Sequence, residues 1–264
     1  MPTKIEWAEE TINPLVGCSK ISEACLNCYA EKMAYRLKCI GNPTYQNVVD
    51  ENGWTGKFKI DWNQLDKPLK WKKPIRIFIG SMTDLFHERI DIDDNFYDRV
   101  MHRIRHCQRH VFMMLTKRVV KMAWVFKNLF NNELPNNLWV GATVENQDQD
   151  HRIETLLSIP AAVRFVSFEP MLGFVDAKKY MGIIHADDID GLDYDDVYGP
   201  WLDGIQWVIC GAETGPKKRP MNIDWARSIR DQCQDAGIPF FFKKDSAGSH
   251  ELDGEIFEQF PIGR

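Results

Sequence analysis

The chain has 264 residues, of which 44% are hydrophobic and 27% are charged, and its formal net charge is −5. This size and composition predict one globular domain over residues 1–264, and the negative charge weighs against a protein that coats nucleic acid nonspecifically. No apolar run reaches the roughly 18–20 residues that cross a membrane, and residues 1–10 lack the apolar core of a secretory signal. We therefore expect a cytoplasmic protein without a membrane segment, whose seven cysteines do not form a disulfide framework.

In chain order, apolar runs predict a series of short strands. A weak first strand is expected through Leu15 and Val16, and six further runs rich in β-branched or aromatic residues follow it. These runs cover residues 75–81, 110–116, 138–144, 163–168, 205–211 and 239–244. Each run is too short and too evenly apolar for a surface strand, which suits parallel strands that are buried on both faces.

Helical segments separate these strands. Residues 94–107 carry apolar side chains on one helical face. Asn146 is expected to cap a helix that ends before Pro160, and Asn222 to cap another that ends at Gly237. Strand starts are spaced by about 25–42 residues, which fits right-handed β–α–β crossovers. We predict an α/β fold, namely a partial or complete parallel β/α (TIM-like) barrel of about seven strands.

An acidic insert is expected within about residues 176–203. Residues 186–203 contain seven aspartates and neither lysine nor arginine. A calcium-binding EF-hand loop aligned on Gly191 would begin at Ala186 and end at Val197, and neither side chain can be a ligand. We therefore interpret the segment as a solvated acidic loop.

Three of the seven cysteines are crowded into one short segment. Cys25 and Cys28 are three positions apart, so near the start of a helix both sulfurs can converge on one metal site. Cys18 comes from the preceding loop, which Gly17 leaves free to fold closely. Three thiolates leave one coordination position open on an iron–sulfur cubane. The spacing alone is equally compatible with structural zinc, for which Cys39 would supply a fourth ligand.

The other cysteines are expected to be structural, because each stands alone in a helix or strand pattern. They are Cys39, Cys107, Cys210 and Cys233.

Polar residues follow nearly every predicted strand. In β/α barrels the active site lies at the carboxyl ends of the strands, so these residues are expected to line one cavity with the cysteines, although turns are polar by default. The residues selected in this way are Ser81, Thr83 and Asp84; Thr116, Lys117 and Arg118; Thr143, Glu145 and Asn146; Glu169; Glu213; and Lys243 and Lys244.

Cations are frequent among the residues that follow strands, and they favour an anionic substrate. The expected substrate-binding residues are Lys117, Arg118, Arg219, Lys243 and Lys244. The alternative is that these side chains form ion pairs with Glu145, Glu169 and Glu213 and only shape the rim of the cavity.

Several motifs in order along the chain resemble a phage-associated, largely uncharacterised family of radical S-adenosylmethionine (SAM)-like proteins with a three-cysteine motif. These motifs are WAEETINPLVGCSKISEACLNCYAE, WKKPIRIFIGSMTDLFHE, MLTKR, WVGATVEN, RFVSFEPMLG, VICGAETGPKKRPM and GIPFFFKK. The resemblance implies a partial β/α barrel whose Cys18, Cys25 and Cys28 hold a [4Fe–4S] cluster. The open iron would chelate SAM, and an electron would cleave SAM to a 5′-deoxyadenosyl radical that abstracts hydrogen from a substrate.

The chain departs from the usual superfamily pattern at the cysteines. Six residues rather than three separate Cys18 from Cys25, and Asn27 replaces the usual aromatic residue before the last cysteine. Because no typical glycine-rich motif ends the second strand, Ser81, Thr83 and Asp84 would have to meet the amino group of SAM. The ribose is expected near Thr143, Glu145 and Asn146, whose acceptors suit hydroxyl donors. Thr116, Glu169 and Glu213 complete the cofactor site that we predict.

The leading hypothesis is therefore a radical SAM enzyme that acts on a nucleotide, nucleic acid or peptide. It implies an electron donor of flavodoxin or ferredoxin type, and it leaves a separate partner protein open. One alternative is a zinc-stabilised β/α-barrel hydrolase with Glu145, Glu169 or Glu213 as general base. The other is a non-catalytic nucleic-acid-binding accessory protein that uses the cations of the rim.

Overall fold

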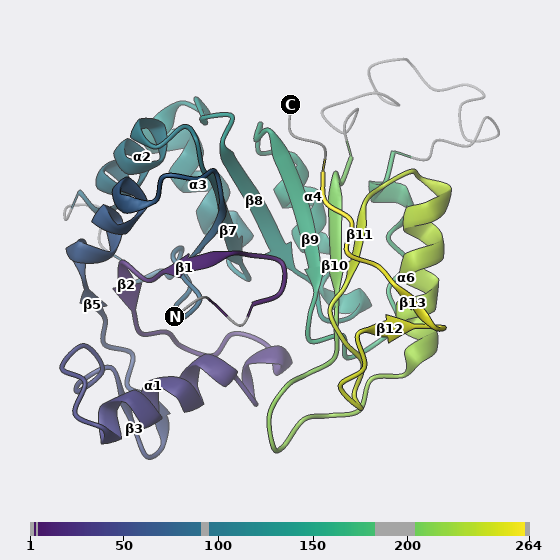
Figure 1. The fold of residues 1–264 in the computed structure, drawn as a ribbon, viewed down its shortest axis with the longest axis horizontal. Helices are drawn as coiled ribbons and strands as arrows, with labels where there is room; N and C mark the ends of the chain where they lie inside the picture. Colours follow the sequence, from purple (N-terminus) through teal and green to yellow (C-terminus); the bar gives the residue numbers. More distant parts are fainter. Residues whose placement is uncertain (1–2, 4, 91–94, 183–203, 262–264) are drawn as a thin grey trace.

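The computed structural model describes residue 3 and residues 5–90, 95–182 and 204–261. Its centre is a sheet of seven parallel strands that follow one another in chain order, so that the sheet curls into a half-barrel (Figure 1). The strands are β1 (Glu10–Ile12), β6 (Arg76–Ile79), β7 (Val111–Thr116), β8 (Leu138–Thr143), β9 (Val163–Phe168), β10 (Trp207–Cys210) and β11 (Phe240–Phe242). The prediction of a parallel, partial β/α barrel is confirmed, whereas the aspartate-rich segment 186–203 lies outside the described residues.

The predicted first strand was wrong. Leu15 and Val16 form β2 (Leu15–Val16), which pairs antiparallel with β5 (Lys59–Ile60) outside the main sheet. The first strand of the sheet is β1, in which Glu10 is paired with Ile77 of β6. β1 is an edge strand of only three residues. It lacks the continuous apolar run by which the other strands could be recognised. Two further hairpins pair β3 (Val49–Asp50) with β4 (Gly53–Trp54), and β12 (Glu251–Leu252) with β13 (Glu255–Ile256).

Helices follow most strands. The α-helices are α1 (Tyr29–Cys39), α2 (Phe96–His106), α3 (Val119–Phe130), α4 (His151–Leu157) and α6 (Ile223–Asp235). The 3₁₀ helices are η1 (Glu23–Cys25), η2 (Trp62–Lys70), η4 (Gln147–Gln149) and η5 (Lys178–Tyr180). The side chain of Asn222 accepts a hydrogen bond from the Asp224 amide at 3.0 Å, and Gly237 has a positive φ of 66°, which confirms the predicted ends of α6. Asn146 instead precedes η4 without a side-chain cap bond, so its predicted capping role was wrong.

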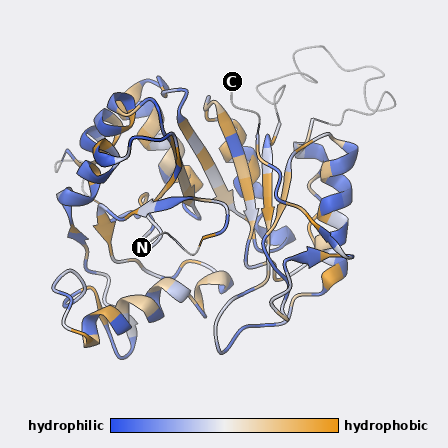
Figure 2. Cartoon of the chain, in the orientation of Figure 1, coloured by the Kyte–Doolittle hydropathy of each residue, from blue (hydrophilic) through white to orange (hydrophobic). Residues whose placement is uncertain are grey.

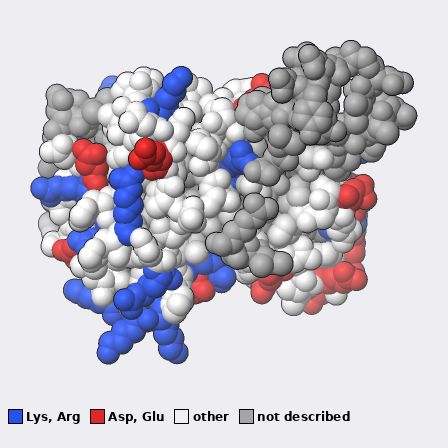
Figure 3. Space-filling view, turned by 90° about the horizontal axis from the view of Figure 1, so that it is seen from above, with Lys and Arg blue, Asp and Glu red and all other residues white. Residues whose placement is uncertain are grey.

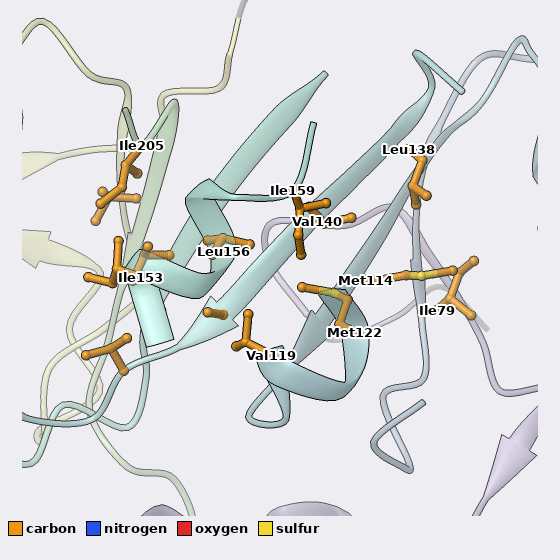
Figure 4. Close-up of a cluster of buried hydrophobic side chains, with 14 of the residues drawn as sticks. Ile79, Met114, Val119, Met122, Leu138, Val140, Ile153, Leu156, Ile159 and Ile205 are labelled. Carbon is orange, nitrogen blue, oxygen red and sulfur yellow. The ribbon is translucent and has the colours of Figure 1, made fainter. Parts of the chain in front are cut away.

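The convex face of the sheet packs against helices. Figure 4 shows Val119 and Met122 of α3 beside Met114 of β7, and Ile153 of α4 on the same apolar layer as Val140 of β8. These side chains are buried, and the central strands are hydrophobic along most of their length (Figure 2). The strands were predictable for this reason, because apolar side chains on both faces leave no alternation in the sequence.

The concave face is filled by aromatic side chains. Phe165 and Trp207 lie with ring centroids 5.4 Å apart, and Trp139 and Phe241 meet Trp207 edge-on. A Cβ atom on Gly141 would lie 2.5 Å from the ring of Phe165, so this strand position needs glycine. The interior of the half-barrel is therefore packed at this level, and a ligand site has to lie at the strand ends.

Both ends of the chain cover the open side of the half-barrel. Trp7 packs on Phe78 at 4.7 Å, and Phe260 packs on Trp207 at 5.3 Å. Phe260 also lies 3.8 Å below the guanidinium of Arg76, at the start of β6. Through Phe260, β6 and β10 are linked across the open side by side chains rather than by a closed hydrogen-bond ladder.

No helix in the described part of the chain is long and apolar enough to cross a membrane.

Figure 3 shows the molecule from above Figure 1, with Lys and Arg gathered at the lower left and Asp and Glu more frequent at the right. Figure 3 is viewed onto the end of the sheet from which the strand arrows of Figure 1 point away. The cysteine segment described below lies at the other end of the sheet, with α1 (Figure 1).

Candidate metal and cofactor site

The three cysteines lie in one loop, residues 17–28, which we call the cysteine loop. Cys18 follows β2, Cys25 ends η1 and Cys28 is the N-cap residue of α1. Gly17 has φ of 109°, and a Cβ atom there would lie 2.3 Å from the carbonyl oxygen of Lys57, so only glycine fits where the loop begins. The three thiols are free and partly exposed.

The cysteine loop is fastened to the carboxyl end of β6. The Thr83 hydroxyl donates to the carbonyl oxygen of Gly17 at 2.5 Å, and the Tyr29 hydroxyl donates to the carbonyl oxygen of Ser81 at 2.7 Å. The Ser81 hydroxyl donates to Asn13 at 3.2 Å. These polar groups hold the loop on the sheet, which revises the expectation that Ser81 and Thr83 meet the amino group of SAM.

Asp84 is likewise used inside the protein. One carboxylate oxygen accepts from the Thr116 hydroxyl at 2.6 Å, and the other accepts from the Lys117 amide at 3.2 Å and from Arg118 at 3.3 Å. Arg118 also donates to Glu88 and, at 3.1 Å, to the carbonyl oxygen of Ser19 beside Cys18. Asp84, Thr116 and Arg118 are therefore a buried network that supports the cysteine loop rather than a free cofactor or substrate site.

His87 supports the same loop. Its Nε2 atom lies 2.6 Å from the Ser19 hydroxyl, and its Nδ1 atom accepts from the Arg89 amide at 3.1 Å. Since Nδ1 accepts this bond, Nε2 carries the proton and donates to Ser19. Burial and the nearby Arg118 lower the pKa of His87, so the ring is neutral in this network at neutral pH.

On the opposite side, the cysteine loop is fastened to the segment that follows β10. The Asn27 side chain donates to Glu213 at 2.9 Å, and Arg219 donates to Glu213 at 2.5 Å and to the carbonyl oxygen of Glu23 at 3.0 Å. Burial acts to raise the pKa of Glu213, but the bonds from Arg219 and Asn27 outweigh it and hold that pKa below its usual value. The loop thus spans the carboxyl ends of the sheet from β6 to β10.

Glu169 and Lys243 form an ion pair beside the same strand ends. A Cβ atom on Gly211, which lies between them on the neighbouring strand, would be 3.1 Å from Lys243 and 3.7 Å from the Glu169 carboxyl group. Glycine therefore leaves the space in which the pair forms. Burial acts to lower the pKa of Lys243, but Glu169 outweighs it, so that pKa is raised and the side chain stays charged. Lys243 and Lys244 also approach Glu6, at 3.8 and 3.5 Å.

Two buried acceptors follow β8 without a partner. Glu145 accepts from Arg152 at 2.7 Å through one oxygen, while its other oxygen is buried and unbonded. The side-chain oxygen of Asn146 is also buried and unbonded. The backbone of Thr143 accepts from Arg152 at 2.8 Å, so the carboxylate is held in place. Buried acceptors without donors are rare, and two adjacent ones at a strand end indicate a ligand that brings hydrogen-bond donors.

Burial disfavours the ionised form of two of the thiols. Burial and the charge of Asp84 raise the pKa of Cys18 to about 12, and burial raises the pKa of Cys28. Cys28 interacts electrostatically with both other thiols, so the three share one environment. Metal ions and iron–sulfur clusters bind cysteine as the thiolate, so the positive charge of a bound metal would stabilise the ionised form of these thiols. In the described ranges, no group of three or more His, Cys, Asp or Glu side chains forms a ready metal-ion site.

Cys39 cannot complete a zinc site with these thiols. It is the last residue of α1, whereas Cys28 precedes the first, so the two lie about 16 Å apart along the helix. Zinc–sulfur bonds are about 2.3 Å long, which excludes a shared ion. Cys107, Cys210 and Cys233 are buried in the core.

The predicted cations of the rim are mostly paired. Arg118, Arg219 and Lys243 bind carboxylates, and Lys244 lies near Glu6. The alternative considered above thus describes the pairing of Glu169 and Glu213, whereas Arg118 pairs with Asp84 and Glu88 instead. Glu145 pairs with Arg152, which was not among the predicted cations. Lys117 has no ion-pair partner in the part of the chain that the structure describes, and its charge acts on Cys28.

Sequence reasoning missed several residues of the site. Ser19, Asn27, Tyr29 and His87 fasten the cysteine loop, and Arg152 orients Glu145. The first four lie within the cysteine-containing and LFHE motifs, so the motifs contained the signal, but their partners are distant in the sequence.

Comparisons with known proteins give one match. No curated protein and no solved structure matches the chain. A family model described as "Protein of unknown function (DUF5131)" matches residues 2–261 and so includes the cysteine loop and all seven strands. The chain therefore belongs to the DUF5131 family.

Proposed function

We propose that this protein is a radical SAM enzyme in which Cys18, Cys25 and Cys28 hold a [4Fe–4S] cluster and SAM binds beside it at the carboxyl ends of the strands. When bound, the two cofactors together supply one-electron cleavage of SAM and hydrogen abstraction from a substrate. In this proposal the strand ends would hold the cofactors, and the buried aromatic cluster in the half-barrel would exclude water from beneath them.

One observation carries the proposal: the loop that bears the three thiols and the two unsatisfied buried acceptors both lie at the carboxyl ends of strands of the same sheet. Arg219 connects them, because it donates to Glu23 in the cysteine loop and also interacts electrostatically with Glu145. The free oxygens of Glu145 and Asn146 suit the hydroxyl groups of a ribose. The acceptors thus support the predicted ribose site, whereas Ser81, Thr83 and Asp84, which were predicted near the amino group of SAM, are already engaged in hydrogen bonds within the protein.

The three glutamates of the hydrolase hypothesis are poorly suited to act as a general base. Glu145, Glu169 and Glu213 each pair with a cation, and the pKa of Glu213 is lowered by its bonds to Arg219 and Asn27. A base that must accept a proton near neutral pH needs the opposite shift. The nucleic-acid hypothesis loses support, because four of the five predicted rim cations lie beside carboxylates and only Lys117 has no ion-pair partner among the described residues.

Anaerobic purification tests the cluster directly. We expect a brown protein with broad absorption near ~400 nm, containing about four irons and four sulfides per chain. Cys28→Ala should abolish iron binding, while Cys233→Ala, which removes a buried thiol remote from the loop, should retain it. A colourless protein that binds zinc through the same three cysteines would contradict the proposal.

Calorimetry on the reconstituted protein tests the SAM site. Asn146→Ala removes one of the unbonded acceptors, and we expect SAM to bind about tenfold more weakly, equivalent to ~1.4 kcal/mol. Asn63→Ala is the matched control, because this exposed side chain lies in η2 away from the cysteine loop. Equal affinities in the two variants would exclude Asn146 from the SAM site.

A further inference from the structure

Exposed hydrophobic side chains are concentrated next to the cysteine loop. Eleven large hydrophobic residues are exposed in the described ranges, and six of them lie between residues 21 and 40. These six are Ile21, Leu26, Tyr29, Met33, Tyr35 and Ile40. Single exposed apolar residues are ordinary, whereas a concentration of this kind indicates an interaction surface.

Helix α1 aligns three of them in one stripe. Tyr29, Met33 and Ile40 are spaced by four and seven residues, so they share one side of the helix. Ile40 follows the last helical residue and is 72% exposed. A neighbouring side of the helix carries Ala30 and Ala34, which are buried, so α1 already has its packing face. Met33 and Ile40 belong to none of the hydrophobic clusters that the described residues form, whereas Tyr29 also fastens the cysteine loop through its bond to Ser81.

Positive charge borders this stripe. Lys32 and Arg36 are exposed and lie on the same side of α1, each three residues from a member of the stripe. Lys217 and Lys218 are exposed on the segment after β10, and Asn27 of the cysteine loop donates to the Lys217 carbonyl oxygen at 2.9 Å. We call Leu26, Tyr29, Met33 and Ile40, together with these four cations, the α1 patch.

Carboxylates are fewer in this region. Between residues 18 and 40 the acidic side chains are Glu23 and Glu31. Glu31 is directed away from the stripe, because it pairs with Lys20 at 3.2 Å and accepts from the Trp54 amide at 3.2 Å. Glu23 remains exposed. The α1 patch is thus an apolar centre with a predominantly positive border.

We propose that the α1 patch docks an acidic redox protein that delivers one electron to the cluster. The inference rests on the proposed function, which consumes an electron for each SAM cleaved. The apolar centre favours a protein over a nucleic acid, and the cations favour a partner with negative charge at its contact face. Because the patch includes Leu26 and Tyr29, the next residues after Cys25 and Cys28, a partner docked on it would lie beside the cysteine loop.

The electron balance of the step is simple. The partner, a low-potential flavin or iron–sulfur protein, is oxidised by one electron, and the cluster is reduced by one. No bond is formed or broken in the transfer itself, and no proton has to move. The α1 patch contributes orientation and proximity, so its loss should weaken the complex without altering the cluster.

Binding of an acidic flavodoxin, measured by titration calorimetry with the reconstituted protein, tests the docking surface. Met33→Glu and Arg36→Glu should each weaken binding at least tenfold, and the unmodified protein should bind more weakly at high salt. Ile256→Glu and Lys70→Glu are charge-matched controls at exposed positions on other elements, and they should bind normally. Equal affinity of patch and control variants would overturn the inference, as would binding of anionic vesicles in place of the flavodoxin.

The cluster provides the readout that separates the two proposals. The patch variants should retain the iron content and the dithionite-reduced spectrum of the unmodified protein, while the rate of cluster reduction by flavodoxin falls at least tenfold. If dithionite reduces the cluster and flavodoxin reduces it equally fast in all variants, the docking inference is wrong. The proposed function would be unaffected by that result. A protein without a cluster would contradict the proposed function and this inference with it.

Discussion

Arg118 is expected to be the most sensitive charged residue for stability. Its side chain is 4% exposed, and that of its partner Asp84 is 9% exposed. Removing one partner of a buried ion pair costs about 3–5 kcal/mol. Asp84 keeps hydrogen bonds from the Thr116 hydroxyl and from two backbone amides, those of Phe86 and Lys117, so we expect the lower end of this range for Arg118→Met, about 3 kcal/mol.

Urea unfolding of the metal-free protein measures this loss. A change of about 3 kcal/mol corresponds to roughly a 150-fold change in the folding equilibrium, and it should lower the unfolding midpoint by about 1 M or more. The double variant Asp84→Asn/Arg118→Met should be less destabilised than the sum of its single variants, because the second change removes the unpaired charge.

A surface pair supplies the control. Arg103 lies 2.7 Å from Asp66, whose side chain is 57% exposed, and Arg103→Met should cost only about 0.2–1 kcal/mol. If Arg118→Met were as mild as Arg103→Met, or strictly additive with Asp84→Asn, the network would not support the cysteine loop as we describe.

Three further predictions concern the thiols, the aromatic interior and one exposed ion pair. Cys39→Ala should leave iron binding intact, measured as iron per chain, because helix α1 separates this thiol from Cys28 by about 16 Å; loss of iron would show that the metal site is arranged differently. Trp207→Ala should destabilise the protein by about 3–5 kcal/mol in urea unfolding, because the fully buried ring contacts aromatic residues on both sides. Hydrogen bonds from Arg227 and Arg230 lower the pKa of Asp253 to about 2. The ionised carboxylate therefore stabilises the fold above pH ~4, and this contribution is lost as the pH falls through about 2. An NMR titration that finds an ordinary pKa for Asp253 would contradict this interaction with the two arginines.

The long strands could be predicted because a buried strand is recognisable from the apolar composition of a few consecutive residues. Residues 138–143 and 163–168 are buried at every position, so most of their side chains are apolar on both faces of the sheet. β1 could not be predicted in this way. It is an edge strand of three residues, and it is a strand only because β6 offers a partner.

The cysteines and the strand-end residues were also recognisable in the sequence, since their spacing and their positions after apolar runs are local features. Their tasks were not. Arg118 and Asp84 could be taken as ligands for substrate and cofactor, but the structure pairs them with each other and directs Arg118 to Ser19, 99 residues away in the chain.

Local sequence therefore determined where strands end and which residue types gather there, because burial and turn chemistry act over a few residues. Tertiary structure decided which of those polar groups satisfy one another and which remain free. Glu145 and Asn146 illustrate the difference: nothing in their sequence neighbourhood separates them from Asp84 and Thr116, yet they alone keep unbonded buried oxygens among these four. A hydrogen bond depends on the position of both partners, and the curled sheet sets those positions across distant segments of the chain.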